Sequence, residues 1–169
     1  MSIVEPEQLP YRPCVGALVV NRDGLIFVGH RMDGPEEPEG PGTWWQMPQG
    51  GIDEGEDPRV AVFRELYEET SIRSVRIVAE SEGWWLYDLP PELQGKAWGG
   101  RFRGQKQKWY AMRFEGEESE IDVVNVPDGH DAEFDRWQWV GPDELMNRVV
   151  PFKRDVYRRI VDELVPLIR

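Results

Sequence analysis

The chain has 169 residues, of which 40% are hydrophobic and 11% aromatic. This suits one globular domain over residues 1–169 and leaves no room for two ordinary ones. A net charge of −12 argues against a protein that coats nucleic acid non-specifically, because that function needs a basic surface. No run approaches about 18 apolar residues and the N-terminal segment lacks a signal-peptide pattern, so we expect a cytoplasmic protein with no membrane partner.

Two apolar runs near the N-terminus predict a β-hairpin. Residues 15–20 and 25–30 flank the turn-forming sequence Asn21-Arg22-Asp23-Gly24, whose Asp-Gly pair tolerates positive φ. The single cysteine, Cys14, adjoins the first run and is expected to be a buried thiol. The following segment 33–42, DGPEEPEGPG, is rich in Pro, Gly and acid, which predicts an exposed loop.

A helix is predicted from Asp57-Pro58 to Thr70, because Asp caps free backbone N–H groups and Pro fits the first helical turn. At about 100° per residue, four apolar side chains share one arc, namely Val60, Phe63, Leu66 and Tyr67. The opposite arc carries carboxylates, namely Glu65, Glu68 and Glu69. We expect the apolar arc to pack and the glutamates to occupy the other face.

Further strands are predicted at residues 75–79, 84–87, 108–114 and 137–140, which are short runs bounded by Gly, Pro or charge. Near the C-terminus, a four-residue repeat predicts an amphipathic helix over 151–165 with the apolar stripe Phe152, Val156, Ile160 and Leu164. Basic residues lie off this stripe, namely Lys153, Arg154, Arg158 and Arg159. Mixed strands with two helices indicate an α/β or α+β sandwich.

The charge is unevenly distributed. Residues 93–114 hold six basic residues and no acid, whereas residues 115–135 hold nine acids and neither Lys nor Arg. The basic segment could bind a polyanion, or both segments could be solvated loops.

The three glutamates of the predicted helix repel one another. Like charges three or four residues apart cost a helix roughly 0.2–0.5 kcal/mol per pair. A divalent cation would offset this cost, since Mg²⁺ binds carboxylates together with substrate phosphates. A solvated acidic face is the alternative.

The sequence GGIDEGEDPRVAVFRELYEETSI, residues 50–72, resembles the Nudix box, the loop-helix-loop signature of hydrolases that cut nucleoside diphosphates linked to another group. The resemblance implies an α/β/α sandwich with a mixed sheet. It also implies that Glu65, Glu68 and Glu69 bind Mg²⁺ or Mn²⁺. The remaining matched positions are structural, namely Gly50, Glu56 and Arg64, with Arg64 bracing the loop.

One position departs from the family pattern. The family usually has glycine where this chain has Ser71, just past the helix, where a left-handed backbone is often needed. Serine in that conformation costs roughly 1–2 kcal/mol. We therefore expect Ser71→Gly to raise the melting temperature if φ is positive there.

Further stretches resemble one branch of the family, the bacterial RNA pyrophosphohydrolases and the similar dinucleoside polyphosphate hydrolases. The matching stretches are YRP (11–13), WQMPQGG (45–51), GQKQKW (104–109), EFD (133–135), WQWV (137–140) and FKRDVY (152–157). This resemblance adds Glu133 to the metal-binding and catalytic set, as a ligand or as a group that helps take the proton of water. Glu69 or Glu65 is expected to lie nearest that water.

Substrate-binding residues are expected around this set. Fixed cations stabilise charge that develops on phosphoryl oxygens, and the candidates are Arg12, Arg31, Lys106, Lys108 and Lys153. Tyr87 and Phe152 could sandwich a base, since aromatic faces stack on bases, and Gln49 lies in a matching motif. His30 and His130 receive no role.

We expect removal of pyrophosphate from triphosphorylated RNA 5′ ends, leaving a monophosphate. The main alternative is asymmetric hydrolysis of diadenosine tetraphosphate to ATP and AMP; a non-catalytic nucleotide-binding module and a hydrolase of free nucleotides are further options. The acidic segment 33–42 could lie at the mouth of the site and disfavour long RNA, or be a remote solvated loop. A monomer is expected, with no DNA partner.

Overall fold

The computed structural model describes residues 9–32, 44–88, 101–149 and 153–168. In these ranges the strands are β1 (Tyr11–Val20), β2 (Ile26–Arg31), β3 (Trp45–Gln46), β4 (Gln49–Gly51), β5 (Val75–Glu80), β6 (Trp85–Asp88), β7 (Gly104–Phe114) and β8 (Phe134–Val140). The helices are α1 (Pro58–Thr70), α2 (Pro142–Arg148) and α3 (Arg154–Ile168), with 3₁₀ turns η3 (Glu118–Glu120) and η4 (Pro127–Gly129). The expected loop at 33–42 and Phe152 lie outside the described residues.

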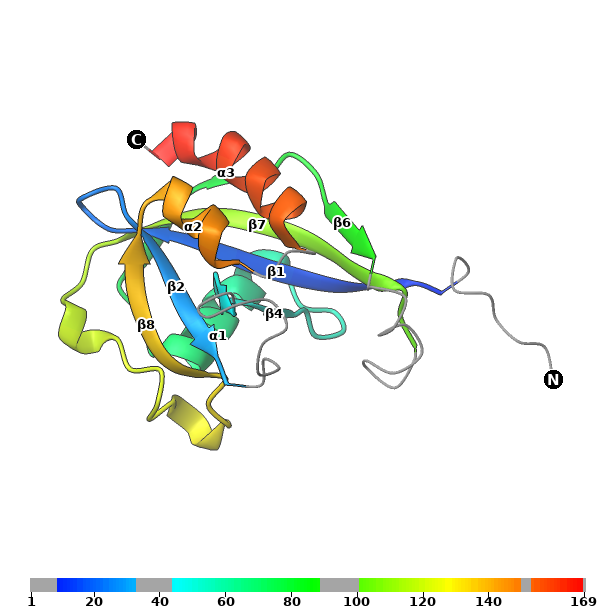
Figure 1. Cartoon of the computed structure of the whole chain (residues 1–169). Coiled ribbons are helices and arrows are strands. Elements are labelled where there is room, and N and C mark those ends of the chain that lie inside the picture. The colour runs from blue at the N-terminus through cyan, green and yellow to red at the C-terminus, as the bar shows by residue number, and fades with distance from the viewer. Residues whose placement is uncertain (1–8, 33–43, 89–100, 150–152, 169) are drawn as a thin grey trace.

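The strands form one mixed sheet. Its main order is β3-β2-β1-β7-β5, with β4 paired to β1, β6 to β7 and β8 to β2. The parallel pair is β1 and β7, in register from Tyr11 opposite Gly104 to Val20 opposite Arg113, and the other pairs are antiparallel. The long β1–β7 pair forms the centre of the sheet (Figure 1).

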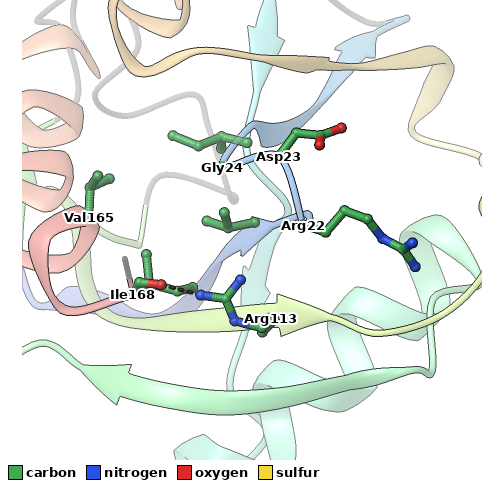
Figure 2. A pocket seen from close by; sticks show the side chains of 8 residues that line it. Arg22, Asp23, Gly24, Arg113, Val165 and Ile168 are labelled. Atoms are coloured by element: carbon green, nitrogen blue, oxygen red, sulfur yellow. Dashed lines mark hydrogen bonds between the residues drawn. The ribbon is translucent and has the colours of Figure 1, made fainter.

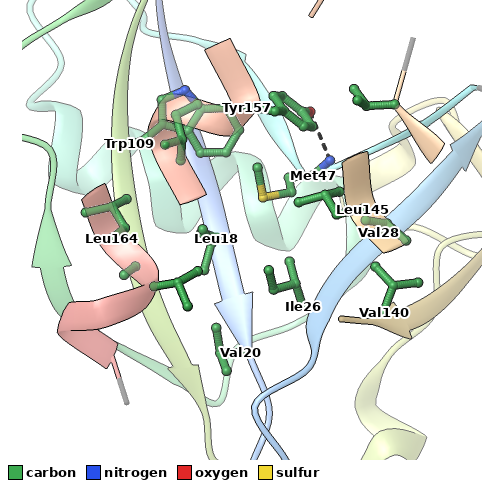
Figure 3. Packing of buried hydrophobic residues seen from close by; sticks show 14 of the residues in the cluster. Leu18, Val20, Ile26, Val28, Met47, Trp109, Val140, Leu145, Tyr157 and Leu164 are labelled. Atoms are coloured by element: carbon green, nitrogen blue, oxygen red, sulfur yellow. Dashed lines mark hydrogen bonds between the residues drawn. The ribbon is translucent and has the colours of Figure 1, made fainter. Parts of the chain in front are cut away.

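Alternate residues of β1 enter two separate cores. Leu18 and Val20 pack with residues of α2 and α3, whereas Val15, Ala17 and Val19 pack with residues of α1. Figure 1 shows α2 and α3 on the face of the sheet opposite α1, and Figure 3 shows the first core, with Tyr157 between Trp109 and Met47. The structure confirms the predicted α/β/α sandwich.

The local predictions hold where turn and cap chemistry is strong. The Asn21 side chain accepts hydrogen bonds from the backbone of the hairpin turn, and Cys14 is fully buried in β1. Asp57 Oδ1 accepts from Arg59 N at 2.8 Å and thereby caps α1. At the other end, Ser71 has φ 66°, which confirms the left-handed position.

The packed face of α1 was predicted wrongly. Val60 and Phe63 are 59% and 40% exposed, and Glu69, assigned to the opposite face, is 4% exposed. The buried residues of α1 are Ala61, Val62, Leu66, Glu69 and Thr70. Two of the three glutamates, Glu65 and Glu69, are thus turned toward the sheet. Within the predicted apolar arc, Leu66 is buried as expected, whereas Val60 and Phe63 face outward.

The C-terminal helix follows its predicted stripe, since Val156, Ile160 and Leu164 are all buried. It extends to Ile168, past Pro166, and α2 was not predicted. Lys153 was expected off the apolar stripe but is only 3% exposed. None of the helices in the described ranges combines the length and apolarity that a membrane crossing needs.

Candidate active site

Glu65 is held against the sheet by a close approach to Gly50. A Cβ atom at Gly50 would lie 2.1 Å from Glu65 Cδ, so only glycine leaves room for this carboxylate. Gly50 itself is fixed opposite Val15 in the pairing of β4 with β1. The glycine predicted as structural therefore determines where the Glu65 carboxylate lies.

Arg64 connects the loop before α1 to the glutamates of the helix. Its guanidinium makes two hydrogen bonds to Glu56, both at 2.8 Å, and a third to the carbonyl of Gly51 at 2.9 Å. Nη1 donates to Glu65 at 3.0 Å and to Glu68 at 3.1 Å. Pairing with Arg64 lowers the pKa of Glu56 to about 2, so Glu56 is an ionised structural anchor.

Glu65 and Glu69 differ from Glu56, because their surroundings raise the pKa of each carboxyl group. Burial raises the pKa of Glu69 well above its usual value, and the charges of Glu133 and Glu65 raise it further. Neither buried oxygen of Glu69 makes a hydrogen bond of normal geometry with the described residues. Burial also raises the pKa of Glu65 to about 7 against the opposing effect of Arg64, with Glu68 and Glu133 adding to the rise.

These carboxylates fit a divalent cation by their chemistry. Within the described ranges, no three Asp, Glu, His or Cys side chains form a ready-made metal cage. Nevertheless, Glu133 is close enough to Glu65 and to Glu69 to raise the pKa of each, and buried carboxylate oxygens without donors are what a hard cation binds. Glu68 is the fourth carboxylate of the cluster, linked to it through Arg64.

Three predicted phosphate-binding cations lie beside the cluster. Arg12 lies over the chain at Gly51, where a Cβ atom would be 2.6 Å from Nη2. Arg12, Glu65 and Lys153 all act electrostatically on Cys14, whose pKa burial raises to about 11. Arg31 and Glu133 line one pocket of about 190 Å³.

Two other predicted cations make different contacts. Lys106 Nζ lies 5.2 Å from the centre of the Trp84 ring, and Lys108 donates to the carbonyl of Ser81 at 2.6 Å. These contacts are with the β5–β6 segment, so the structure does not bring either lysine together with the glutamates. The Tyr87 side chain and Phe152 lie outside the described part of the chain.

A cluster of glutamines surrounds Gln49. Gln107 Nε2 donates to Gln49 Oε1 at 3.4 Å and to Gln105 Oε1 at 2.8 Å, and Gln49 Nε2 donates to Gln105 at 3.5 Å. Trp109 Nε1 completes the cluster by donating to Gln107 at 2.7 Å. Gln49 is therefore held by β7, whose sequence GQKQKW matched the family pattern.

Sequence reasoning missed two residues that contact the site. His130, which received no role, lies with Nε2 3.3 Å from Glu68 Oε1. Gln46 accepts from both Arg31 and Lys153. Gln46 belongs to the matched stretch WQMPQGG, and this motif could have marked it as a site residue. The sequence near His130 contains no such motif.

Another pocket lies away from this site. It has a volume of about 320 Å³ and is lined by the β1–β2 turn, Arg113 and the end of α3. Figure 2 shows Arg113 directed at the carbonyl of Ile168, to which it donates a hydrogen bond. No predicted site residue lines this pocket, and we assign it no catalytic role.

The chain is similar to known proteins along nearly its whole length. The RNA pyrophosphohydrolases of Brucella abortus (strain 2308) and Rhizobium meliloti (strain 1021) are each 55% identical to this chain. The first alignment covers 95% of this chain and 90% of the relative, and the second covers 96% and 98%. A Caenorhabditis elegans Ap4A hydrolase structure aligns with a TM-score of 0.60 at 14% identity, over 90% of this chain and 98% of that one, which shows a shared fold.

The model of the NUDIX domain matches residues 10–160, a range that includes the glutamate helix, Glu133 and Lys153. The chain therefore belongs to the Nudix hydrolase family.

Proposed function

We propose that this protein is a metal-dependent RNA pyrophosphohydrolase that removes pyrophosphate from triphosphorylated RNA 5′ ends. The observation that carries the proposal is the 55% identity, along nearly the whole chain, to enzymes of that name. The arrangement of the site supports it, because buried carboxylates lie beside Arg12, Arg31 and Lys153. An RNA substrate of this kind also favours the cytoplasm as the site of action.

The reaction is a hydrolysis. The oxygen of water forms a bond to the phosphorus nearest the RNA, the anhydride bond to the next phosphate breaks, and pyrophosphate leaves. Arg12, Arg31 and Lys153 would bind the phosphate oxygens, whose charge otherwise repels the attacking water. One of the buried glutamates would accept the proton of that water.

Glu65, Glu68, Glu69 and Glu133 would hold Mg²⁺ or Mn²⁺. When bound, the ion would neutralise phosphate charge and make water more acidic. Gly50 and Arg64 would place Glu65 and Glu68 for this task through the contacts described above.

The test compares kcat/KM on a triphosphorylated oligonucleotide with kcat/KM on diadenosine tetraphosphate, at one stated salt concentration with products identified. Release of pyrophosphate with faster turnover of RNA is expected. Rapid cleavage of the dinucleotide to ATP and AMP beside negligible RNA turnover would reverse the assignment.

Glu68→Gln is the variant that tests the role of the carboxylates. It should lose most of its activity in Mg²⁺ on whichever substrate is preferred, and unchanged activity would contradict the metal assignment. Glu144→Gln in α2 is a matched control, because Glu144 pairs with Arg148 on the surface. This variant is expected to leave turnover unchanged.

A further inference from the structure

Gln46 joins two cations that are far apart in sequence. Its side-chain oxygen accepts from Lys153 Nζ at 3.1 Å and from Arg31 Nη1 at 3.5 Å. The Gln46 residue is 5% exposed and Lys153 is 3% exposed, so their contact lies in the protein interior, where it is not exchanged freely for a contact with water. The contact with Arg31 is partly buried.

The backbone around Gln46 is fixed by the same two elements that carry the cations. Gln46 pairs with Gly29 of β2, the strand that ends at Arg31. The next residue, Met47, donates its backbone N–H to the hydroxyl of Tyr157 in α3 at 3.0 Å, and Lys153 immediately precedes α3. A change in the position of Gln46 would therefore be transmitted to both cations.

The chemistry of the acceptor is informative. An amide oxygen is a neutral acceptor, so it orients two cationic groups without adding negative charge. A glutamate at this position would make the same two contacts and cancel much of the positive potential. An acceptor that served only to stabilise these two cations would be expected to be a carboxylate, because charged hydrogen bonds are the stronger ones.

We propose that Gln46 is a positioning residue that holds Arg31 and Lys153 together as a pair of fixed cations for the phosphate groups of the substrate. The inference rests on the proposed function, because it concerns the same site. Arg31 shares a pocket with Glu133, and Lys153 and Glu65 both act on Cys14. The cation pair thus lies next to the carboxylates at which hydrolysis would occur.

The test uses Gln46→Glu, which keeps the shape of the side chain and adds one negative charge. Calorimetric titration with inorganic pyrophosphate, with Mg²⁺ in excess, should show binding about tenfold weaker or more than in the wild type. The melting temperature should not fall, because the new carboxylate pairs with two cations. Gln138→Glu in β8 is the matched control, since it introduces the same charge at a partly exposed position, and it should bind pyrophosphate like the wild type.

Gln46→Met is the second variant, and it tests the positioning role of Gln46 if Gln46→Glu does not fold. It preserves length but removes the acceptor, and should raise KM several-fold with little change in kcat. A purely structural residue would instead lower the melting temperature and leave KM of the folded fraction unchanged. Equal pyrophosphate affinity in Gln46→Glu and Gln138→Glu, or no pyrophosphate binding by the wild type, would overturn the inference.

The two proposals fail separately. If the wild type hydrolyses triphosphorylated RNA but Gln46 variants bind pyrophosphate normally, the function stands and the role of Gln46 is wrong. If no RNA is hydrolysed while Gln46→Glu still loses pyrophosphate affinity, the cation pair stands and the RNA assignment is wrong.

Discussion

Glu56 and Glu69 are carboxylates of the same box in opposite environments. Glu56 receives two hydrogen bonds from Arg64 and has a pKa lowered to about 2. Glu69 is buried beside Glu133 and Glu65 and has a pKa raised well above the usual value. Arg64 neutralises the charge of Glu56 within the protein, whereas the oxygens of Glu69 receive no such partner from the described residues. The comparison separates carboxylates that stabilise the fold from those available for chemistry.

The largest expected effect comes from Glu69→Gln. Under the proposed function it should lower kcat by roughly 10²–10³-fold, the usual effect of removing one group that stabilises charge in the transition state. In protein stripped of divalent cations at pH 7.5, the same change should raise the melting temperature, because a neutral amide replaces a carboxyl group that is unfavourable in this site.

Glu56→Gln is the matched control for that variant. It should lower the melting temperature, because a charge-assisted pair with Arg64 is lost. If both variants shift stability in the same direction, the contrast between the two carboxylates is wrong.

Stability of the metal-free protein should fall between about pH 4.5 and 7. The pKa of Glu65 is raised to about 7, mainly by burial, so folding stabilises its protonated form. That contribution is complete below the unfolded-state pKa of about 4.5 and is lost as pH rises, a loss on the order of 3 kcal/mol. Glu56 acts in the opposite sense, since its stabilisation is lost as pH falls toward 2. Urea unfolding at pH 5 and pH 7.5 measures the difference, which should be smaller in Glu65→Gln.

Added Mn²⁺ should reverse this trend. A cation that binds only the folded protein stabilises it by about 2.7 kcal/mol at one hundred times its dissociation constant. The gain should be larger at pH 7.5 than at pH 5, because the carboxylates must be ionised to bind. An equal gain in Glu69→Gln would argue that the ion binds elsewhere.

Arg64→Lys should lower the free energy of unfolding by about 2 kcal/mol, because a lysine cannot reproduce the planar fork that binds Glu56 and the carbonyl of Gly51 together. Chemical denaturation measures the loss. Arg59→Lys is a suitable control: Arg59 also pairs with a glutamate, Glu80, but it is largely exposed and should change stability by less than about 0.5 kcal/mol.

The sequence was sufficient to predict those parts of the fold that depend on local chemistry. The Asp57 cap, the bounds of α1 and the left-handed Ser71 all follow from residue types at fixed positions. The packed face of α1 did not follow from the sequence, because amphipathic analysis assigns charge to solvent. Here Glu69 is buried and Phe63 is left 40% exposed.

Contacts between segments that are distant in the chain also could not be predicted from the sequence. The meeting of Arg31 and Lys153 at Gln46 depends on how β2 and α3 flank β3, and no spacing in the chain encodes that distance. The contact of His130 with Glu68 depends similarly on η4 lying against α1. By contrast, the box spacing identified the glutamates because their geometry is set within one loop and one helix.

Ser71 provides the smallest expected effect. Its left-handed backbone costs roughly 1–2 kcal/mol for a residue other than glycine, but its hydroxyl donates to the carbonyl of Asp122 at 2.8 Å, worth about 1 kcal/mol. Ser71→Gly relieves the backbone strain but loses the hydrogen bond to Asp122, so its melting temperature should rise only slightly. Ser71→Ala keeps the strain and loses the hydrogen bond, so it should be less stable than Ser71→Gly by about 1 kcal/mol or more. A Ser71→Ala protein as stable as Ser71→Gly would show that backbone strain at this helix end is negligible.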